Sequence, residues 1–183
     1  MHYRPLALMV LVLTGLHLTP PQAAQKPDVT VTPLRTEYAF TAHVLVGSPI
    51  IVGQGPQGLR RYVPITGGTV DGPLLHGKVL TAGGDSQVVR TDGVLAIDAQ
   101  YVIQTDDGVT VAVSNRGLRL GPAEVMARLA RGEKVAPGEY YFRTAAQFEA
   151  PLGSRYEWLN QAIFVGMAER NPDEAVVHFY RVL

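Results

Sequence analysis

Apolar and polar residues alternate along much of the chain, and this period of two residues predicts β-strands with one buried face. The stretch Arg35–Val46 shows the pattern most simply, because every second side chain from Tyr38 onward is apolar. The apolar side chains on that face are Tyr38, Phe40, Ala42, Val44 and Val46. Gly47-Ser48-Pro49 ends the pattern, since glycine and proline mark turns. We therefore predict a strand over residues 35–46.

The same reasoning predicts further strands and one helix. The other predicted strands are Ile50–Gly53, Arg60–Ile65, Leu74–Leu80, Ser86–Arg90, Val94–Thr105, Val109–Asn115, Tyr140–Glu149, Gln161–Glu169 and Glu174–Leu183. Glycine-rich loops are expected at Thr66–Thr69 and Thr81–Asp85, and tight hairpin turns at Asp92-Gly93 and Asp106–Gly108. Pro122–Arg131 predicts the helix, with proline in its first turn and an apolar stripe. A chain of mostly short strands closes into a β-barrel or packs as a sandwich, and the need to cover exposed strand edges favours the barrel.

The N-terminal segment Met1–Ala24 has the features of a secretory signal peptide. Arg4 precedes the apolar run Leu6–Leu13, which is shorter than the roughly 20 residues of a membrane-spanning helix. A buried helix or a retained anchor is the alternative. We predict export to the periplasm or the exterior, cleavage within Gln22–Gln25, and no stable membrane span afterwards. An extended leader (Gln25–Pro33) and a single β-barrel domain over residues 34–183 would follow.

Composition excludes several classes of function. The 16 basic and 16 acidic residues cancel, so the chain has no electrostatic footprint for nucleic acid. The absence of cysteine excludes disulfides, thiolate zinc sites and thiol nucleophiles. His43, His76 and His178 follow neither of the common zinc spacings, HxH and HExxH. We therefore expect no metal and no cofactor.

Two short motifs, GxGxxG and GxSxG, are common signals of nucleotide binding and of a catalytic serine. Gly53–Gly58 matches GxGxxG by letters, but a strand follows it where a nucleotide-binding loop needs a helix. We interpret it as a turn. No GxSxG nucleophile motif occurs in the chain.

Polar residues within apolar strands are the remaining candidates for chemistry. Asp85 follows two glycines beside a strand, Tyr101 lies in an apolar strand, and Arg143 is flanked by Phe142. Alternate side chains of a barrel point inward, where burial raises the pKa of a carboxyl group and allows it to act as a base. We predict Asp85 as the base, with Arg143 and Tyr101 stabilising negative charge. The alternative is that these residues are surface positions or members of structural salt bridges.

The order of motifs along the chain resembles a known family. The motifs are Arg60–Gly72 (RRYVPITGGTVDG), Gly84-Asp85, Asp98–Tyr101, Thr105–Gly108, Asn115–Gly117, Tyr140–Thr144 and Tyr156–Asn160. Together they resemble the family called domain of unknown function 3237, over about residues 33–183. The resemblance implies a small antiparallel β-barrel similar to allene oxide cyclase and lipocalin-like barrels, and no settled activity.

Six residues match motif positions of this family and are the site candidates. Asp85, Tyr101 and Arg143 are the catalytic candidates. Asn115, Trp158 and Asn160 are the ligand-binding candidates. The family usually carries tryptophan directly after the Asp85 position, and Ser86 stands there in this chain. We expect this difference to leave the cavity wall smaller or more open.

Two main hypotheses follow for function. The first is an exported barrel that binds a small, partly apolar organic ligand. The alternative is a cofactor-independent isomerase, cyclase or lyase that acts on a carbonyl compound, with an aspartate base and Arg or Tyr as anion stabilisers. Both require a hollow barrel into which charged groups project. A third alternative is an envelope protein that binds a partner or forms a homo-oligomer.

Overall fold

Nine antiparallel strands build the molecule in the computed structural model, which describes residues 31–183. The strands are β1 (Thr36–Val46), β2 (Ile50–Gly55), β3 (Gly58–Asp71), β4 (Gly77–Val89), β5 (Leu95–Thr105), β6 (Thr110–Leu120), β7 (Tyr141–Glu149), β8 (Phe164–Arg170) and β9 (Glu174–Val182). The unit formed by Leu34–Leu183 contains all of them. The predicted signal peptide lies outside the described residues.

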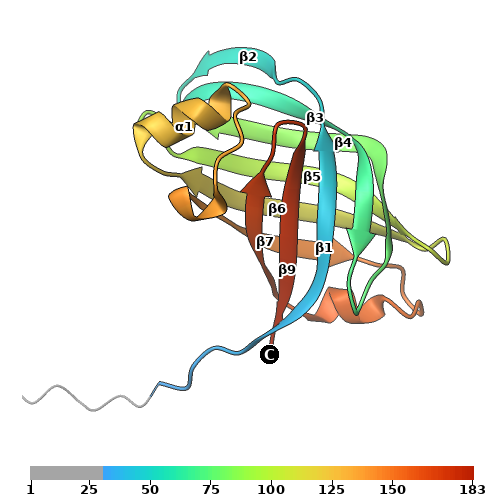
Figure 1. Ribbon diagram of the computed structural model, residues 1–183. Helices are drawn as coiled ribbons and strands as arrows, with labels where there is room; N and C mark the ends of the chain where they lie inside the picture. The colour runs from blue at the N-terminus through green and yellow to red at the C-terminus, as the bar shows by residue number, and fades with distance from the viewer. Residues whose placement is uncertain (1–30) are drawn as a thin grey trace, which may run out of the picture. The chain divides into compact units, whose positions relative to one another are not determined.

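Eight of the strands form a closed barrel. From β3 to β9 each strand pairs with the next, β9 pairs with β1, and β1 pairs with β3. The ninth strand, β2, extends the sheet beyond β3 (Figure 1). Closure leaves the eight strands without a free edge. The prediction of an antiparallel barrel is confirmed, and the sandwich is not what forms.

The two predicted glycine-rich loops are instead parts of long strands. β3 continues through Thr66–Thr69, and β4 continues through Thr81–Asp85. The pairing register shifts between Pro64 and Gly68 on one strand and between Val79 and Gly83 on the other, as it does at β-bulges. Gly68 and Gly83 have φ of +142° and +107°. Residues that carry a Cβ atom rarely adopt this backbone conformation. The glycines therefore bend the strands around the barrel rather than end them.

The hydrophobic core extends along the barrel, and its largest aromatic cluster lies at the end where β7 finishes. Four phenylalanine rings lie with centroids 4.9–5.5 Å apart, in edge-on and tilted arrangements typical of aromatic clusters. These are Phe40, Phe148, Phe164 and Phe179, and their exposed fractions do not exceed 7%. The expected hollow does not run through the whole barrel, because this half is packed with aromatic side chains.

The opposite end of the barrel carries the helix. Helix α1 (Ala123–Ala130) follows β6 and buries Val125 and Leu129, which confirms the predicted helix. It lies at the end where β2 lies (Figure 1). Two short 3₁₀ segments flank β7, namely η1 (Pro137–Glu139) before it and η2 (Glu157–Gln161) after it at the far end. No helix within residues 31–183 is long and apolar enough to cross a membrane.

Candidate functional site

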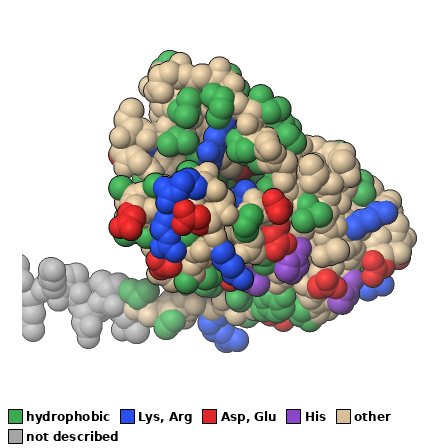
Figure 2. Space-filling view, turned by 45° about the horizontal axis from the view of Figure 1, so that its top comes forward, with side chains coloured by type: hydrophobic (Ala, Val, Ile, Leu, Met, Phe, Trp, Pro, Cys, Tyr) green, Lys and Arg blue, Asp and Glu red, His purple; other side chains and the backbone are tan. Residues whose placement is uncertain are grey.

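A group of charged and polar side chains lines the mouth of the barrel, at the end that carries α1. The group, called the mouth cluster below, consists of Arg61, Asp85, Gln87, Arg119 and Arg170. It surrounds a cavity of about 50 Å³ whose other walls are apolar. The apolar walls are formed by Val46, Pro49, Val63, Ile97, Phe142 and Ala175. Figure 2 shows Lys or Arg side chains within a hollow of the surface.

Strand alternation explains why these side chains meet. Asp85 and Gln87 are two residues apart on β4, so both point to the same side. Arg61 lies directly opposite Gln87 on β3. Arg119 follows Asn115 on β6 by four residues, and both are buried. The cluster thus collects inward-facing positions from separate strands at one height of the barrel.

Hydrogen bonds hold Asp85 in a fixed orientation. Its Oδ1 accepts a bond of 3.0 Å from the backbone N–H of Asp98, and its Oδ2 accepts one from Nε2 of Gln87. The Oε1 of Gln87 in turn accepts a bond of 2.7 Å from Nε of Arg61. Gln87 therefore stands between the carboxylate and the guanidinium and links them indirectly.

Arg119 is the most buried charge of the mouth cluster. Its exposed fraction is 6%, and its guanidinium carbon lies 5.7 Å from the ring centroid of Phe142. The buried Nε atom of Arg119 has no hydrogen-bond partner among the described residues. A buried donor without a partner costs stability, on the order of 1–3 kcal/mol. The barrel thus holds a cation with free hydrogen-bonding capacity beside an empty space.

Burial and like charge shift the pKa values of the cluster. Burial raises the pKa of the Asp85 carboxyl above its ordinary value, although Gln87 and the nearby arginines partly oppose the shift. Burial, assisted by repulsion from Arg170 and Arg61, lowers the pKa of Arg119 to about 10. Burial also lowers the pKa of Arg61 and that of Arg170. Perturbed groups gathered in a cleft are typical of functional sites.

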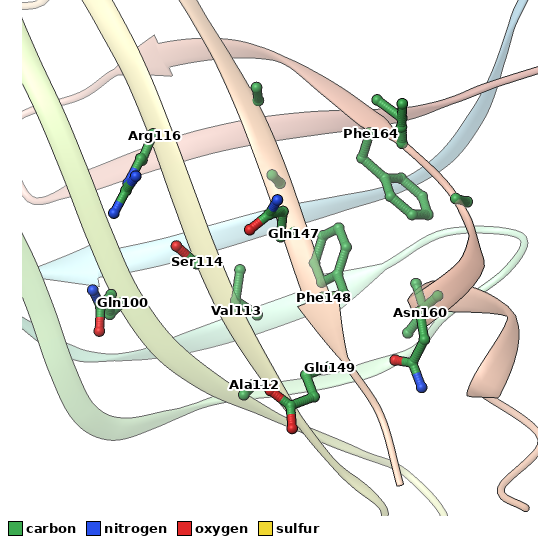
Figure 3. A pocket seen from close by; sticks show the side chains of 15 residues that line it. Gln100, Ala112, Val113, Ser114, Arg116, Gln147, Phe148, Glu149, Asn160 and Phe164 are labelled. Carbon is green, nitrogen blue, oxygen red and sulfur yellow. The ribbon is translucent and has the colours of Figure 1, made fainter. Parts of the chain in front are cut away.

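A second, larger hollow of about 870 Å³ lies along β6 and β7, where Gln100 of β5 and the segment from Leu159 to Phe164 also line it (Figure 3). Exposed and half-exposed side chains such as Gln100, Ser114, Arg116 and Gln147 line it. None of its lining residues carries a buried polar atom that lacks a partner. We therefore place the candidate site at the smaller cavity, where buried polar groups converge, and not at the larger one.

Three predicted site residues lie inside the barrel. Asp85 belongs to the mouth cluster. Asn115 lies in the same cross-strand row, because Ala99 pairs with both residues. Tyr101 is 4% exposed, and burial raises the pKa of its hydroxyl. The Tyr101 hydroxyl and the Asn115 Oδ1 have no partner among the described residues, and neither does the Thr144 hydroxyl, which the sequence did not single out.

The structure does not bring Arg143 to Asp85. Phe142 and Thr144 point inward on β7, so Arg143 points outward. Its guanidinium donates to the backbone oxygen of Phe142 and lies 5.3 Å from the ring centroid of Tyr141. The charge that was expected from Arg143 is supplied in the mouth by Arg61 and the other two arginines of the cluster.

Trp158 and Asn160 lie in η2, far along the barrel from the mouth. The Trp158 ring packs 5.8 Å from Phe164. The Asn160 side chain accepts a bond of 2.7 Å from the backbone N–H of Ala150 and donates one of 2.9 Å to its carbonyl. Asn160 therefore ties η2 to the residue after β7 and lines the larger hollow, whereas Trp158 packs against β8. Neither residue belongs to the mouth cluster.

Ser86 was expected to form part of the cavity wall, but it does not line the cavity. It lies between the inward-facing Asp85 and Gln87, and its hydroxyl accepts a bond of 3.2 Å from Arg60 on the outer face. The residue at this position therefore changes the outer surface of the barrel. Among residues 31–183 no three His, Cys, Asp or Glu side chains gather as a metal site would require.

Comparison with known proteins agrees with the fold. A family model described as "Protein of unknown function (DUF3237)" matches residues 34–182. The chain belongs to the DUF3237 family. A UPF0311 protein of Rhodopseudomonas palustris is 42% identical over 150 residues, which cover 82% of this chain and 97% of that protein.

Two solved structures have the same fold as this chain. A crystal structure from Rhodopseudomonas palustris, described as a conserved protein of unknown function, has a TM-score of 0.80 at 41% identity, and covers 84% of this chain and 100% of its own. A "beta-barrel like protein" from Acinetobacter baumannii has a TM-score of 0.72 at 35% identity, with 85% and 100% covered.

One relative is named for an activity. A hydroalkoxylation enzyme of Penicillium herquei is 34% identical over 84 residues, which cover 45% of this chain and 55% of that protein. The match thus extends over about half of each chain.

Proposed function

We propose that the mouth of the barrel binds a small, partly apolar organic molecule. Val63, Ile97 and Phe142 form an apolar wall, and the mouth cluster supplies polar groups at one end of the cavity. Binding sites commonly combine a mostly apolar lining with a few convergent polar groups. The observation that carries the proposal is the buried Arg119 donor that lacks a partner at this cavity. With the predicted signal peptide, the binding would take place in the periplasm or outside the cell.

Mapping by NMR tests this proposal. Small aromatic fragments, added to the isotopically labelled protein, are expected to shift the amide signals of residues at the mouth, such as Val63, Ile97 and Phe142. The internal comparison is the larger hollow, for which Ser114 and Gln147 report. Shifts confined to the larger hollow, or no shifts with any fragment, would contradict binding at the mouth.

Acid–base catalysis at the same cavity is a second candidate function. It is favoured by Asp85, whose pKa burial raises and whose two oxygens are oriented by hydrogen bonds. A carboxyl with a raised pKa transfers protons more effectively near neutral pH. The relative from Penicillium herquei is named as a hydroalkoxylation enzyme.

Direct titration of Asp85 tests its suitability as a proton-transfer group. The pKa of its carboxyl group, followed through the chemical shift of the carboxyl carbon, is expected to lie above the ordinary value of 3.8, because burial disfavours the charged form. The folded state then binds more protons than the unfolded state between 3.8 and the raised pKa, so stability falls as the pH rises through that window. Asp85→Asn should remove this slope. A titration midpoint at or below 3.8, measured by carbon NMR, would eliminate Asp85 as the proton-transfer group.

A further inference from the structure

We infer that the molecule bound at the mouth is an organic anion, and that its carboxylate head group contacts the arginines of the mouth cluster. The inference rests on the proposed binding function and specifies the chemical class of the ligand. It depends on three features of the cavity, namely its excess of positive charge, an unsatisfied buried donor and a small enclosed volume.

The first feature is the charge balance. Arg61, Arg119 and Arg170 line the same cavity. The charges of Arg170 and Arg61 lower the pKa of Arg119, and the charge of Arg61 lowers that of Arg170. Asp85 is the acidic residue of the cluster, and Asp173 acts on Arg170 from outside the cavity. Three cations against two carboxylates leave a positive excess. When Asp85 is protonated, the excess grows.

The second feature is that the carboxylate does not neutralise the arginines directly. None of the ion pairs among the described residues includes Asp85, Arg61, Arg119 or Arg170. Gln87 occupies one carboxylate oxygen and accepts the Arg61 N–H, so it separates the two charges. Arg61 donates through Nε to Gln87, and Arg170 donates through Nη1 to the backbone oxygens of Asn171 and Glu174. Their remaining N–H groups have no carboxylate partner and can meet an external anion.

The third feature is the orientation of Arg119. Its guanidinium lies 5.7 Å from the Phe142 ring centroid and lines the cavity, with its buried Nε unpartnered. A planar guanidinium matches the two oxygens of a carboxylate, and such charge-assisted bonds are roughly twice as strong as neutral ones. A bound carboxylate would compensate the buried charge and accept hydrogen bonds from the N–H groups of this guanidinium.

The volume of the cavity determines how much of the ligand is enclosed. A cavity needs roughly 10–15 Å³ to hold one water molecule. The cavity of about 50 Å³ at the mouth therefore accommodates a group the size of a carboxylate. A whole aromatic acid does not fit. The head group would therefore be enclosed among the arginines, while the apolar remainder lies against Phe142 and Ile97 toward the opening.

A pair of matched probes tests the inference. Benzoate and benzamide have nearly the same shape and differ in the charge of the head group. We expect benzoate to bind at the mouth at least tenfold more tightly than benzamide, as measured by NMR titration. Arg119→Met should abolish this preference, and Arg61→Met should reduce it. Arg143→Gln, which removes an arginine from the outer face, is the control and should leave both affinities unchanged.

The possible outcomes separate the two proposals. Equal binding of benzoate and benzamide at the mouth would retain the binding function and overturn the anionic ligand. An unchanged preference for benzoate in Arg119→Met would also overturn the assignment of the head group to this arginine. Absence of binding of both probes at the mouth would contradict the binding function itself.

Discussion

Replacing Gly68 with alanine is expected to lower the free energy of unfolding by at least about 4 kcal/mol, or to prevent folding. Gly68 pairs with Val44 where β3 closes the barrel against β1. A Cβ atom at this position would lie 1.9 Å from the backbone oxygen of His43. Because the clash is with backbone, no side-chain rotation relieves it, and the two strands must separate. Urea denaturation followed by circular dichroism measures the loss.

Gly53→Ala is the matched control for this substitution. Gly53 has φ of +130°, close to the +142° of Gly68, but no atom lies within 4 Å of a Cβ added there. The control therefore contains the backbone strain, of order 1–3 kcal/mol, without the clash. Equal losses of stability in the two variants would show that closure of the barrel does not depend on the close approach at Gly68.

Replacing Arg119 with methionine is expected to stabilise the protein by about 1–4 kcal/mol, the range found when a buried ion pair is replaced by well-packed apolar side chains. Arg119 is buried, and the cost of its charge appears as a pKa lowered to about 10. The guanidinium remains protonated at pH 7, so the folded protein bears that cost at neutral pH. Methionine fills a similar space and needs no hydrogen-bond partner. Urea denaturation at pH 7 gives the difference in the free energy of unfolding.

The pH dependence gives this prediction a second readout. Above about pH 10 the unfolded chain still binds the proton that folded Arg119 has released, so wild-type stability should rise with pH there. The advantage of Arg119→Met should therefore be constant below about pH 10 and shrink above it. Arg143→Met, at an outward-facing position, should change stability by no more than about 0.5 kcal/mol. A loss of more than about 1 kcal/mol in Arg119→Met would contradict an uncompensated buried charge.

The hairpin of β5 and β6 shows why the fold was predictable from the sequence. Leu95, Ile97, Ala99, Tyr101 and Ile103 alternate with more exposed positions, and all five are buried. The turn that follows uses a glycine with φ of +86°. Alternation and turn chemistry act over a few residues, so they can be read locally.

The two mispredicted loops show what local reading misses. A glycine pair within a strand pattern indicates either a turn or a bulge, and the letters alone do not distinguish them. Gly68 and Gly83 are bulge residues because the strands must curve around a closed barrel. Curvature is a property of the whole sheet, which the local pattern does not contain.

The candidate site was predicted in part. Asp85 belongs to the mouth cluster, whereas Asn115 and Tyr101 are buried in the barrel but do not line its cavity. Arg119 was missed because the predicted strand ended at Asn115, five residues before β6 ends at Leu120. Arg143 was placed on the wrong face. Strict alternation from the inward-facing Phe142 would have shown that its neighbour points outward. The register between strands determines which charges converge at the mouth. The sequence of a single strand does not determine that register.

The packed aromatic end of the barrel determines how a ligand can enter and leave. Since Phe40, Phe148, Phe164 and Phe179 fill that end, a molecule held at the mouth has one route in both directions. The far portion of the bound molecule extends toward solvent and does not contact the protein. Acids that share a head group but differ in chain length would then bind with nearly equal affinity, so discrimination would concentrate in the terminal few atoms of the molecule.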